Sequence, residues 1–196
     1  MKDKVARFFD SVADNWDNTN DLDFEVLEKI ADIAEISEGK SVLDVGSGTG
    51  VLIPFFLKRK VSHVTALDIS EKMLQIAEKK YSGENVSFVC SDILSFCCNE
   101  KFDCVMVHNA FPHFLSQKEA MEKLKSLTDC GGTLTIAHSI SRNDVLKCHE
   151  TVPEISVELP EAQVVAEMFG DDFEKFTVIS DEKSYIVSAT RKKIEV

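Results

Sequence analysis

The chain has 196 residues and a formal net charge of −12, with 44% hydrophobic and 29% charged side chains. A chain of this length can bury a full-sized core, so we expect one globular domain. The acidic balance disfavours nucleic acid as a partner, because binding to a phosphate backbone depends on Lys and Arg. No apolar segment reaches the length of a membrane span, and charges interrupt the N-terminal segment. We therefore expect a cytoplasmic protein without a signal peptide or membrane contact.

Two helices are predicted at the start of the chain. Apolar residues recur at helical spacing over residues 4–16 and again over residues 24–36. The polar stretch between them, residues 17–21, is turn-prone and typical of a hinge. The first helix either packs on the domain surface or forms a lid over a ligand site.

A strand over Ser41–Val45 runs straight into a glycine-rich turn. Asp44 lies near the end of this strand, and three glycines follow at alternate positions. Glycine permits the backbone angles of a sharp turn, so we expect bare peptide N–H groups to approach a ligand there. A helix over residues 51–58 follows, with Thr49 as its expected N-terminal cap.

Two further strands end beside acidic residues. The second strand, residues 61–67, ends at Asp68, and a helix follows over residues 71–81. Asp68 comes about 20 residues after the glycine turn, the separation expected of a carboxylate that binds two ribose hydroxyls. The alternative is a carboxylate that only caps the helix. The third strand, residues 86–90, is followed by Asp92, which is either a ligand contact or a turn residue.

The second half of the chain continues the alternation of strands and helices. We expect strands over 102–107 and 133–138, helices over 117–127 and 160–169, a loop with a short helix over 139–149, and a final pair of strands over 173–179 and 184–190. The link between the last two strands is too short for a parallel crossover, so they are predicted to form an antiparallel hairpin.

This order predicts an α/β fold with a seven-stranded, mostly parallel sheet, helices on both faces and a C-terminal antiparallel hairpin. We expect one domain over residues 1–196. Within it, residues 1–37 would form a helical lid or cap, residues 38–150 a cofactor-binding core, residues 151–171 a substrate-side segment, and residues 172–192 the hairpin.

The spacing of the glycines distinguishes between nucleotide sites. A dinucleotide fingerprint has Gly-x-Gly-x-x-Gly, whereas here the third glycine comes one residue early, and no Lys-Ser/Thr follows as in a P-loop. The form Asp-x-Gly-x-Gly-x-Gly resembles motif I of the class I S-adenosylmethionine (SAM)-dependent methyltransferases, which have a Rossmann-like sheet. The string from Phe9 to Asp17 resembles the N-terminal segment of the ubiquinone/menaquinone C-methyltransferase-like group, of the methyltransferase domain 11/25 type.

The resemblance implies SAM as the cofactor and S-adenosyl-L-homocysteine (SAH) as its product. It implies cofactor contacts from Asp44, Gly46, Ser47, Gly48 and Gly50 at the first strand, from Asp68, Ile69 and Met73 after the second, from Asp92 and Ile93 after the third, and from His108 and Trp16. The sequence departs from the group after the fourth strand, where His108-Asn109 replaces the usual Arg-Asn pair. The quinone substrates of that group are therefore not carried over.

Histidines concentrate after the fourth and fifth strands, whose carboxyl ends face the cofactor in such a sheet. Because histidine accepts protons near neutral pH, we expect His113 or His138 to act as general base, with His108 in the same catalytic group. Arg142 would orient an anionic substrate group. Two alternatives remain, a zinc or iron site formed by these three histidines with His149, and ordinary loop histidines.

The acceptor pocket is expected to involve residues 138–159, and Phe111, Phe114 and Phe169 are expected either as its apolar walls or as core residues. The remaining histidine, His63, should lie far from the chemistry. We predict methyl transfer from SAM to a small-molecule acceptor by in-line displacement, with no metal. The alternatives are an NAD(P)-dependent Rossmann oxidoreductase and a SAM-binding module without catalysis. The identity of the acceptor, the oligomeric state and the role of Cys97-Cys98 are not specified by these patterns.

Overall fold

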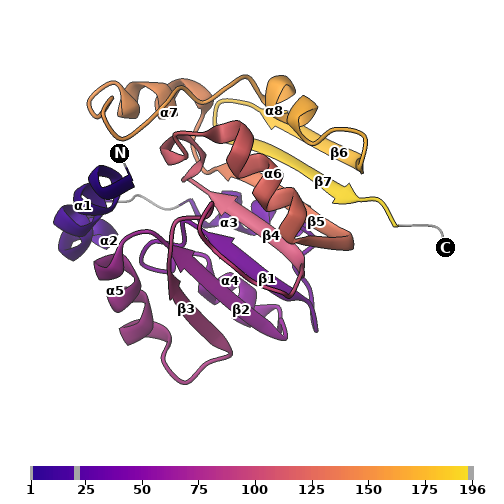
Figure 1. Cartoon of the computed structure of the whole chain (residues 1–196), viewed down its shortest axis with the longest axis horizontal. Helices are drawn as coiled ribbons and strands as arrows, with labels where there is room; N and C mark the ends of the chain where they lie inside the picture. The colour runs from indigo at the N-terminus through magenta and orange to yellow at the C-terminus, as the bar shows by residue number, and fades with distance from the viewer. Residues whose placement is uncertain (1, 20–22, 194–196) are drawn as a thin grey trace.

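The computed structural model describes residues 2–19 and 23–193, which form one seven-stranded sheet flanked by helices (Figure 1). The sheet order is β3-β2-β1-β4-β5-β7-β6. The strands are β1 (Ser41–Val45), β2 (His63–Asp68), β3 (Val86–Cys90), β4 (Phe102–His108), β5 (Thr128–His138), β6 (Phe173–Ser180) and β7 (Tyr185–Arg191). The first five are parallel, and β7 pairs antiparallel with both β5 and β6. The predicted fold class is therefore confirmed.

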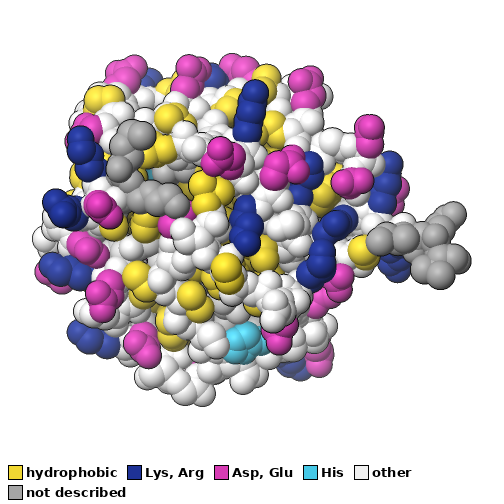
Figure 2. All heavy atoms as spheres, viewed as in Figure 1, with side chains coloured by type: hydrophobic (Ala, Val, Ile, Leu, Met, Phe, Trp, Pro, Cys, Tyr) yellow, Lys and Arg dark blue, Asp and Glu magenta, His cyan; other side chains and the backbone are white. Residues whose placement is uncertain are grey.

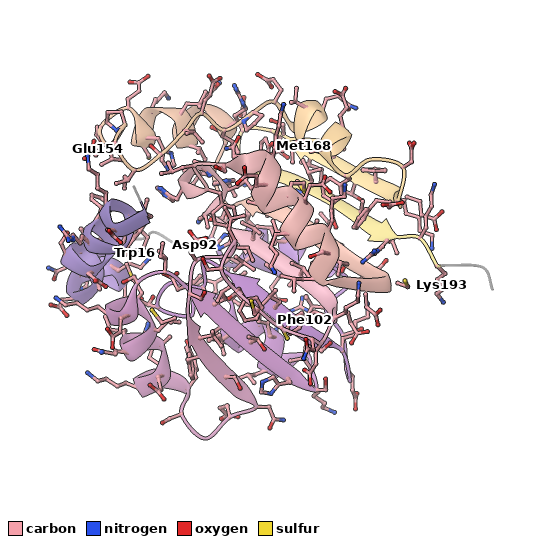
Figure 3. The ribbon with its side chains drawn as sticks, viewed as in Figure 1. Trp16, Asp92, Phe102, Glu154, Met168 and Lys193 are labelled. Carbon is pink, nitrogen blue, oxygen red and sulfur yellow. The ribbon has the colours of Figure 1, made fainter. Side chains whose placement is uncertain are left out.

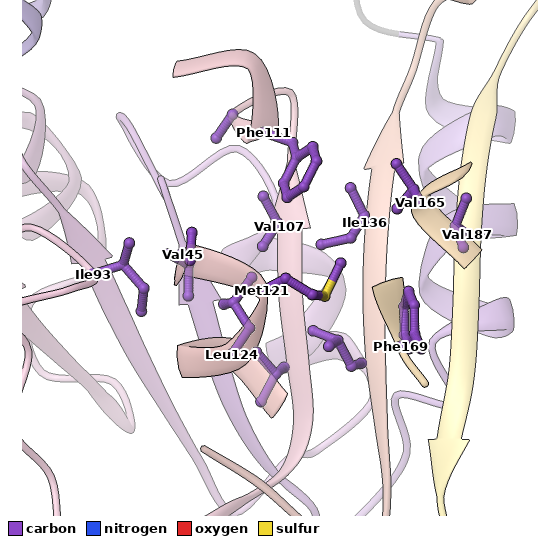
Figure 4. Close-up of a cluster of buried hydrophobic side chains, with 14 of the residues drawn as sticks. Val45, Ile93, Val107, Phe111, Met121, Leu124, Ile136, Val165, Phe169 and Val187 are labelled. Atoms are coloured by element: carbon purple, nitrogen blue, oxygen red, sulfur yellow. The ribbon is translucent and has the colours of Figure 1, made fainter. Parts of the chain in front are cut away.

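The helices lie on both faces of this sheet. They are α1 (Lys2–Val12), the 3-10 turn η1 (Ala13–Asn15), α2 (Trp16–Thr19), α3 (Phe24–Ile33), α4 (Ile53–Lys58), α5 (Glu71–Tyr81), the 3-10 turn η2 (Phe111–His113), α6 (Gln117–Leu127), α7 (Arg142–His149) and α8 (Ala162–Met168). Residues that alternate along a strand point to opposite faces. In β1, Val42 accordingly packs with α3 and α4, whereas Leu43 and Val45 belong to the core under α6 and α8 (Figure 4).

The sheet order places β1 between β2 and β4, so the chain leaves β1 on one side and returns on the other. Ligands of open α/β sheets bind outside the carboxyl ends of the strands at such a switch point. The α1–α2 segment lies at this edge (Figure 1), and Trp16 of α2 and Asp92 after β3 are both found there (Figure 3).

Several element boundaries differ from the sequence prediction. The first helix is interrupted by η1, and residues 17–19 of the expected hinge continue as α2, while its residues 20 and 21 lie outside the described residues. Strand β5 begins at Thr128, earlier than predicted. The residues around Gly131 and Gly132 are part of this strand, which continues through a register shift in its pairing with β4. Thr49 does not cap α4, whose N-cap position is Leu52 without a side-chain hydrogen bond.

The surface carries acidic and basic side chains interspersed over the face shown in Figure 2. Ion pairs also join neighbouring elements, as Arg59, which follows α4, does with Glu28 and Asp32 of α3. No helix in the described part of the chain is both long and apolar enough to cross a membrane.

Candidate functional site

A cavity of about 610 Å³ opens at the carboxyl edge of the sheet. One part is formed by the glycine turn and the ends of β1, β2 and β3, and we call it the cofactor side (residues 44–49, 67–69, 73 and 91–93). The other part follows β4, and we call it the acceptor side (residues 108–110, 113–116 and 120). Residues of α1 and α2, among them Phe9 and Trp16, also line the cavity.

The glycine turn is fastened to the end of β2 by its own amides. The N–H groups of Gly46 and Ser47 both donate to the carbonyl of Leu67, at 2.7 and 3.1 Å, and that of Gly48 donates to Asp68 Oδ2 at 2.8 Å. The expectation that these amides are bare is therefore wrong. What the glycines provide is positive φ and close approach, since a Cβ on Gly46 would overlap Ala110.

A Cβ on Gly48 would instead meet open cavity, with only the indole nitrogen of Trp16 at 3.9 Å. Gly50 is the one residue of the expected cofactor set that does not line the cavity. A Cβ there would press against Ile53 and Tyr81, so this glycine serves the packing of the turn. Among the three glycines, Gly48 is therefore the one whose missing side chain leaves space for a ligand.

Two carboxylates are buried side by side on the cofactor side. Asp44 is 2% exposed, and burial together with the charge of Asp68 raises its pKa to about 7. Burial also raises the pKa of Asp68, although backbone amides of Ser70, Gly48 and Ile69 act against that shift. The amide hydrogen bonds favour the ionised form of Asp68 without outweighing its burial, whereas Asp44 is poised to titrate near neutral pH.

The other residues predicted for the cofactor side lie around the same cavity. Ile69, Met73, Asp92 and Ile93 all line the cavity. Asp92 is oriented locally, because its Oδ1 accepts a hydrogen bond of 2.8 Å from the amide of Leu94. The apolar residues after β2 and β3 and the carboxylate after β3 therefore surround one slot at the strand ends.

The N-terminal helices are tied to this slot by polar contacts. Asp17 accepts a 2.6 Å hydrogen bond from Thr49 Oγ1 and forms a 2.6 Å ion pair with Lys80. Partial burial alone would raise the pKa of Asp17, but its bonds to Lys80 and Thr49 lower it. Asp10 accepts bonds from Ser70 Oγ and from the amide of Lys72 at the start of α5. The role of Asp10 carries no motif signal and was missed in the sequence.

The acceptor side contains fewer of the predicted residues than expected. His108, Asn109, His113 and Phe114 line the cavity, but His138, Arg142 and the other residues of 138–159 do not. Phe111 and Phe169 belong to the hydrophobic core. Residues 138–159 therefore support the cavity wall from behind and do not line it. For example, the amide of Val157 donates to the carbonyl of Pro112.

Arg142 is engaged elsewhere. Its guanidinium forms ion pairs with Glu158 at 3.0 Å and Glu161 at 2.9 Å, and its Nε donates to the carbonyl of Leu159. These contacts tie α7 to the segment before α8. His63, by contrast, lies at the start of β2 as expected, bonded to Ser87 and away from the cavity.

Two buried polar atoms in the cavity wall have no partner among the described residues, Ser47 Oγ and His108 Nε2. Buried polar groups are nearly always hydrogen-bonded, so these atoms indicate where polar groups of a ligand bind. Burial lowers the pKa of His108 to about 4, which keeps its imidazole neutral near pH 7. The four-histidine metal site is not formed, since no three metal-ligating side chains among the described residues are arranged around one ion.

Comparisons with known proteins agree with this geometry. A family model described as a methyltransferase domain matches residues 42–132. A malonyl-[acyl-carrier protein] O-methyltransferase from Ilyobacter polytropus is 25% identical over 99% of this chain and 74% of its own. A ubiquinone/menaquinone biosynthesis C-methyltransferase from Hahella chejuensis is 30% identical over 67% of this chain, which spans only 58% of that relative.

Among solved structures, the magnesium protoporphyrin IX methyltransferase of Synechocystis PCC 6803 with bound SAH superposes with a TM-score of 0.73. The match covers 98% of this chain and all of the other chain at 23% identity. At this level of identity the likeness concerns the fold alone.

Proposed function

Because this chain belongs to the class I SAM-dependent methyltransferases, we propose that it transfers the methyl group of SAM to a small-molecule acceptor held on the acceptor side of the cavity. The observation that carries this proposal is that one cavity joins the glycine turn to the segment after β4. Methyl transfer needs the cofactor and the attacking atom in a single space from which water is excluded.

SAM fits the residues of the cofactor side. The open space at Gly48 and the unpartnered Ser47 Oγ suit the methionine end, and Asp68 suits the ribose hydroxyls. Asp92, Ile69 and Ile93 suit the adenine. When bound, SAM supplies a methyl group on a sulfonium leaving group, which is the difficult part of the chemistry. The residues of this chain bind and orient SAM and the acceptor, and they shield both from water.

On the acceptor side, His108 is the group best suited to accept a proton. Its Nε2 is buried in the cavity wall without a partner among the described residues, and burial holds the imidazole neutral. In contrast, both ring nitrogens of His113 lie within hydrogen-bonding distance of other groups, and His138 does not line the cavity. We therefore assign the general-base role to His108, for acceptors whose attacking atom carries a proton.

The charge of the cavity wall supports a neutral or cationic acceptor. Its two lysines, Lys58 and Lys80, are each paired with a carboxylate, at 2.7 Å from Glu28 and 2.6 Å from Asp17. Among the described residues, this leaves no lysine or arginine in the wall to bind an anionic acceptor. A malonyl thioester, the type of substrate named for the Ilyobacter relative, would bring a carboxylate into this acidic cavity.

The test has two stages. Calorimetry with SAM, SAH and NADH should show binding of SAM and SAH only. Binding of NADH would instead support an oxidoreductase. Turnover is then followed by SAH release with panels of neutral, cationic and anionic acceptors. We expect activity in the first two panels and its loss in His108→Gln with SAM affinity retained. Preference for malonyl thioesters would contradict the acceptor class, and SAM binding without any turnover would favour a non-catalytic module.

A further inference from the structure

Two imidazoles meet at the acceptor side of the cavity. His113 of η2 and His149 of α7 have their Nε2 atoms 3.2 Å apart and their ring centroids 4.8 Å apart. Nδ1 of His113 lies 3.1 Å from the carbonyl oxygen of Ile155, and Nδ1 of His149 lies 2.7 Å from that of Val145. A carbonyl oxygen can only accept, so each Nδ1 carries a hydrogen.

The protons available to this pair do not satisfy all three contacts. Two neutral rings with hydrogen on Nδ1 leave a lone pair on each Nε2, so a bond between the Nε2 atoms needs one extra proton. Without that extra proton, the two lone pairs face each other across 3.2 Å.

A metal cation would resolve this arrangement. Zinc binds imidazole nitrogens at about 2.0–2.1 Å in tetrahedral geometry, which sets two such ligands about 3.2–3.4 Å apart. Metal-bound histidines also donate their other ring N–H to a carbonyl or carboxylate, as both His113 and His149 do here. The observed Nε2 separation and both second hydrogen bonds match this pattern.

A third imidazole lies close to the pair. His138 is 2% exposed at the end of β5, and its Nε2 has no partner among the described residues. Burial lowers its pKa well below the ordinary value, and the charges of His108, His149 and His113 lower it further. This imidazole is a buried polar neighbour of the pair and not a third ligand, since no three metal-ligating side chains are grouped among the described residues.

We propose that His113 and His149 bind a divalent transition-metal ion, of the kind that imidazole prefers, through their Nε2 atoms. Because no third ligand is assembled among the described residues, the ion keeps positions open to water or to the acceptor. His113 lines the cavity, so the ion would lie at the wall of the acceptor side.

This position gives the ion a chemical role that rests on the proposed function. A hydroxyl or thiol of the acceptor that binds the ion releases its proton more readily, to His108 or to water. Its electron pair then forms the bond to the methyl carbon, while the carbon–sulfur bond of SAM breaks and SAH leaves. Metal binding itself needs neither SAM nor turnover.

The experiment is titration of the chelator-treated full chain with Zn²⁺, and with Co²⁺ as a coloured probe. We expect one ion per chain and a Co²⁺ spectrum without a thiolate charge-transfer band. Mutation of an outer-shell partner typically costs about 10- to 100-fold in metal affinity, so His149→Gln or His113→Gln, which removes a direct ligand, should weaken binding by at least about 100-fold. His63→Gln and the double variant Cys97→Ser/Cys98→Ser are matched controls, a surface histidine and the adjacent thiol pair, and both should bind as the parent does.

Three results would overturn the proposal: no ion bound by the parent, binding that persists in His149→Gln, or a nitrogen NMR spectrum at neutral pH that shows a proton shared between the Nε2 atoms. SAM calorimetry on the same samples reports folding and the proposed function separately, because His149 does not line the cavity. If His149→Gln loses SAM binding through misfolding, the spectrum of Co²⁺ in the parent decides between nitrogen and sulfur ligands.

Discussion

The two sides of the cavity are built in different ways. The cofactor side draws on three short stretches, each directly at the end of its strand, and it contains two buried carboxylates, Asp44 and Asp68. The acceptor side consists of one stretch after β4, supported from behind by segments more than 30 residues further along the chain, as in the contact of His113 with Ile155. Local construction makes the cofactor side recognisable in the sequence, whereas support from distant segments leaves the acceptor side without a sequence signal.

The two sides also differ in electrostatic cost. Asp44 and Asp68 raise the free energy of the folded state because neither burial nor like charge favours ionisation. The acceptor side is lined by neutral groups, and its histidines are held uncharged by burial. Variants on the cofactor side should therefore alter stability and SAM binding together, whereas variants behind the acceptor side should leave SAM binding unchanged.

The largest effect is expected for Gly46→Ala. Gly46 has φ of 73° and its added Cβ would overlap Ala110, which links the glycine turn to the loop after β4. A left-handed backbone for alanine and overpacking together cost up to about 5 kcal/mol. We expect a large loss in the free energy of unfolding measured with urea, and loss of SAM binding by calorimetry.

Gly39→Ala is the matched control. Gly39 has φ of 82°, but its added Cβ would meet nothing within 4 Å. Only the backbone cost of about 1–2 kcal/mol should remain, with SAM affinity unchanged. Equal effects of the two substitutions would show that the contact of Gly46 with Ala110 does not matter.

Asp44→Asn should separate stability from binding. The pKa of Asp44 is raised from 3.8 to about 7, so below about pH 4 the carboxyl is protonated in both folded and unfolded chains. Between about pH 4 and 7 the unfolded chain is ionised while the folded chain still holds the proton, so the parent loses stability as the pH rises, by about 4 kcal/mol in total, and the loss levels off above about pH 7. We expect the variant to be more stable than the parent at about pH 8, with the difference vanishing below about pH 4.

The same variant is expected to bind SAM more weakly, because the site loses a carboxylate that the cationic cofactor favours. Urea unfolding across pH and calorimetry at about pH 8 measure the two effects. A variant that is less stable than the parent at every pH would show that Asp44 stabilises the folded chain instead of straining it.

This contrast explains what could be predicted from the sequence. Asp68 and the glycine turn could be placed because the spacing of a strand, a turn and a second strand fixes their positions. Arg142 was misplaced because its partners, Glu158 and Glu161, lie in a stretch without periodicity or motif. Likewise, sequence spacing does not reveal that His113 and His149 face each other, since only the folded chain brings η2 and α7 together.

Asp68→Asn is expected to have an intermediate effect, on stability as well as on SAM binding. The carboxylate already accepts from the amides of Gly48 and Ser70, and an amide side chain cannot accept through both of its ends. Loss of bonds to a charged acceptor, worth about 1.5–3 kcal/mol, should weaken SAM binding by about 10- to 100-fold. Calorimetry measures this change directly.

Asp103→Asn is the matched control for that substitution. Asp103 Oδ2 accepts from the amide and the hydroxyl of Ser41, at 2.8 and 2.9 Å, at the amino end of β1 and away from the cavity. This variant should lose stability but keep its SAM affinity. If Asp68→Asn bound SAM as tightly as Asp103→Asn does, Asp68 would have no part in holding the ribose.

The smallest effect is expected for Arg142→Gln, behind the acceptor side. The Arg142 side chain is 14% exposed, but Glu158 and Glu161 are 74% and 67% exposed, so solvent screens both ion pairs and the loss of stability should be about 1 kcal/mol. SAM affinity should stay unchanged, and Glu158→Gln should reproduce part of the loss while it retains the guanidinium. Turnover decides whether this residue only supports the wall: a selective fall of about 100-fold in kcat/KM for anionic acceptors, without any loss of stability, would mean that Arg142 leaves its glutamates to bind the acceptor.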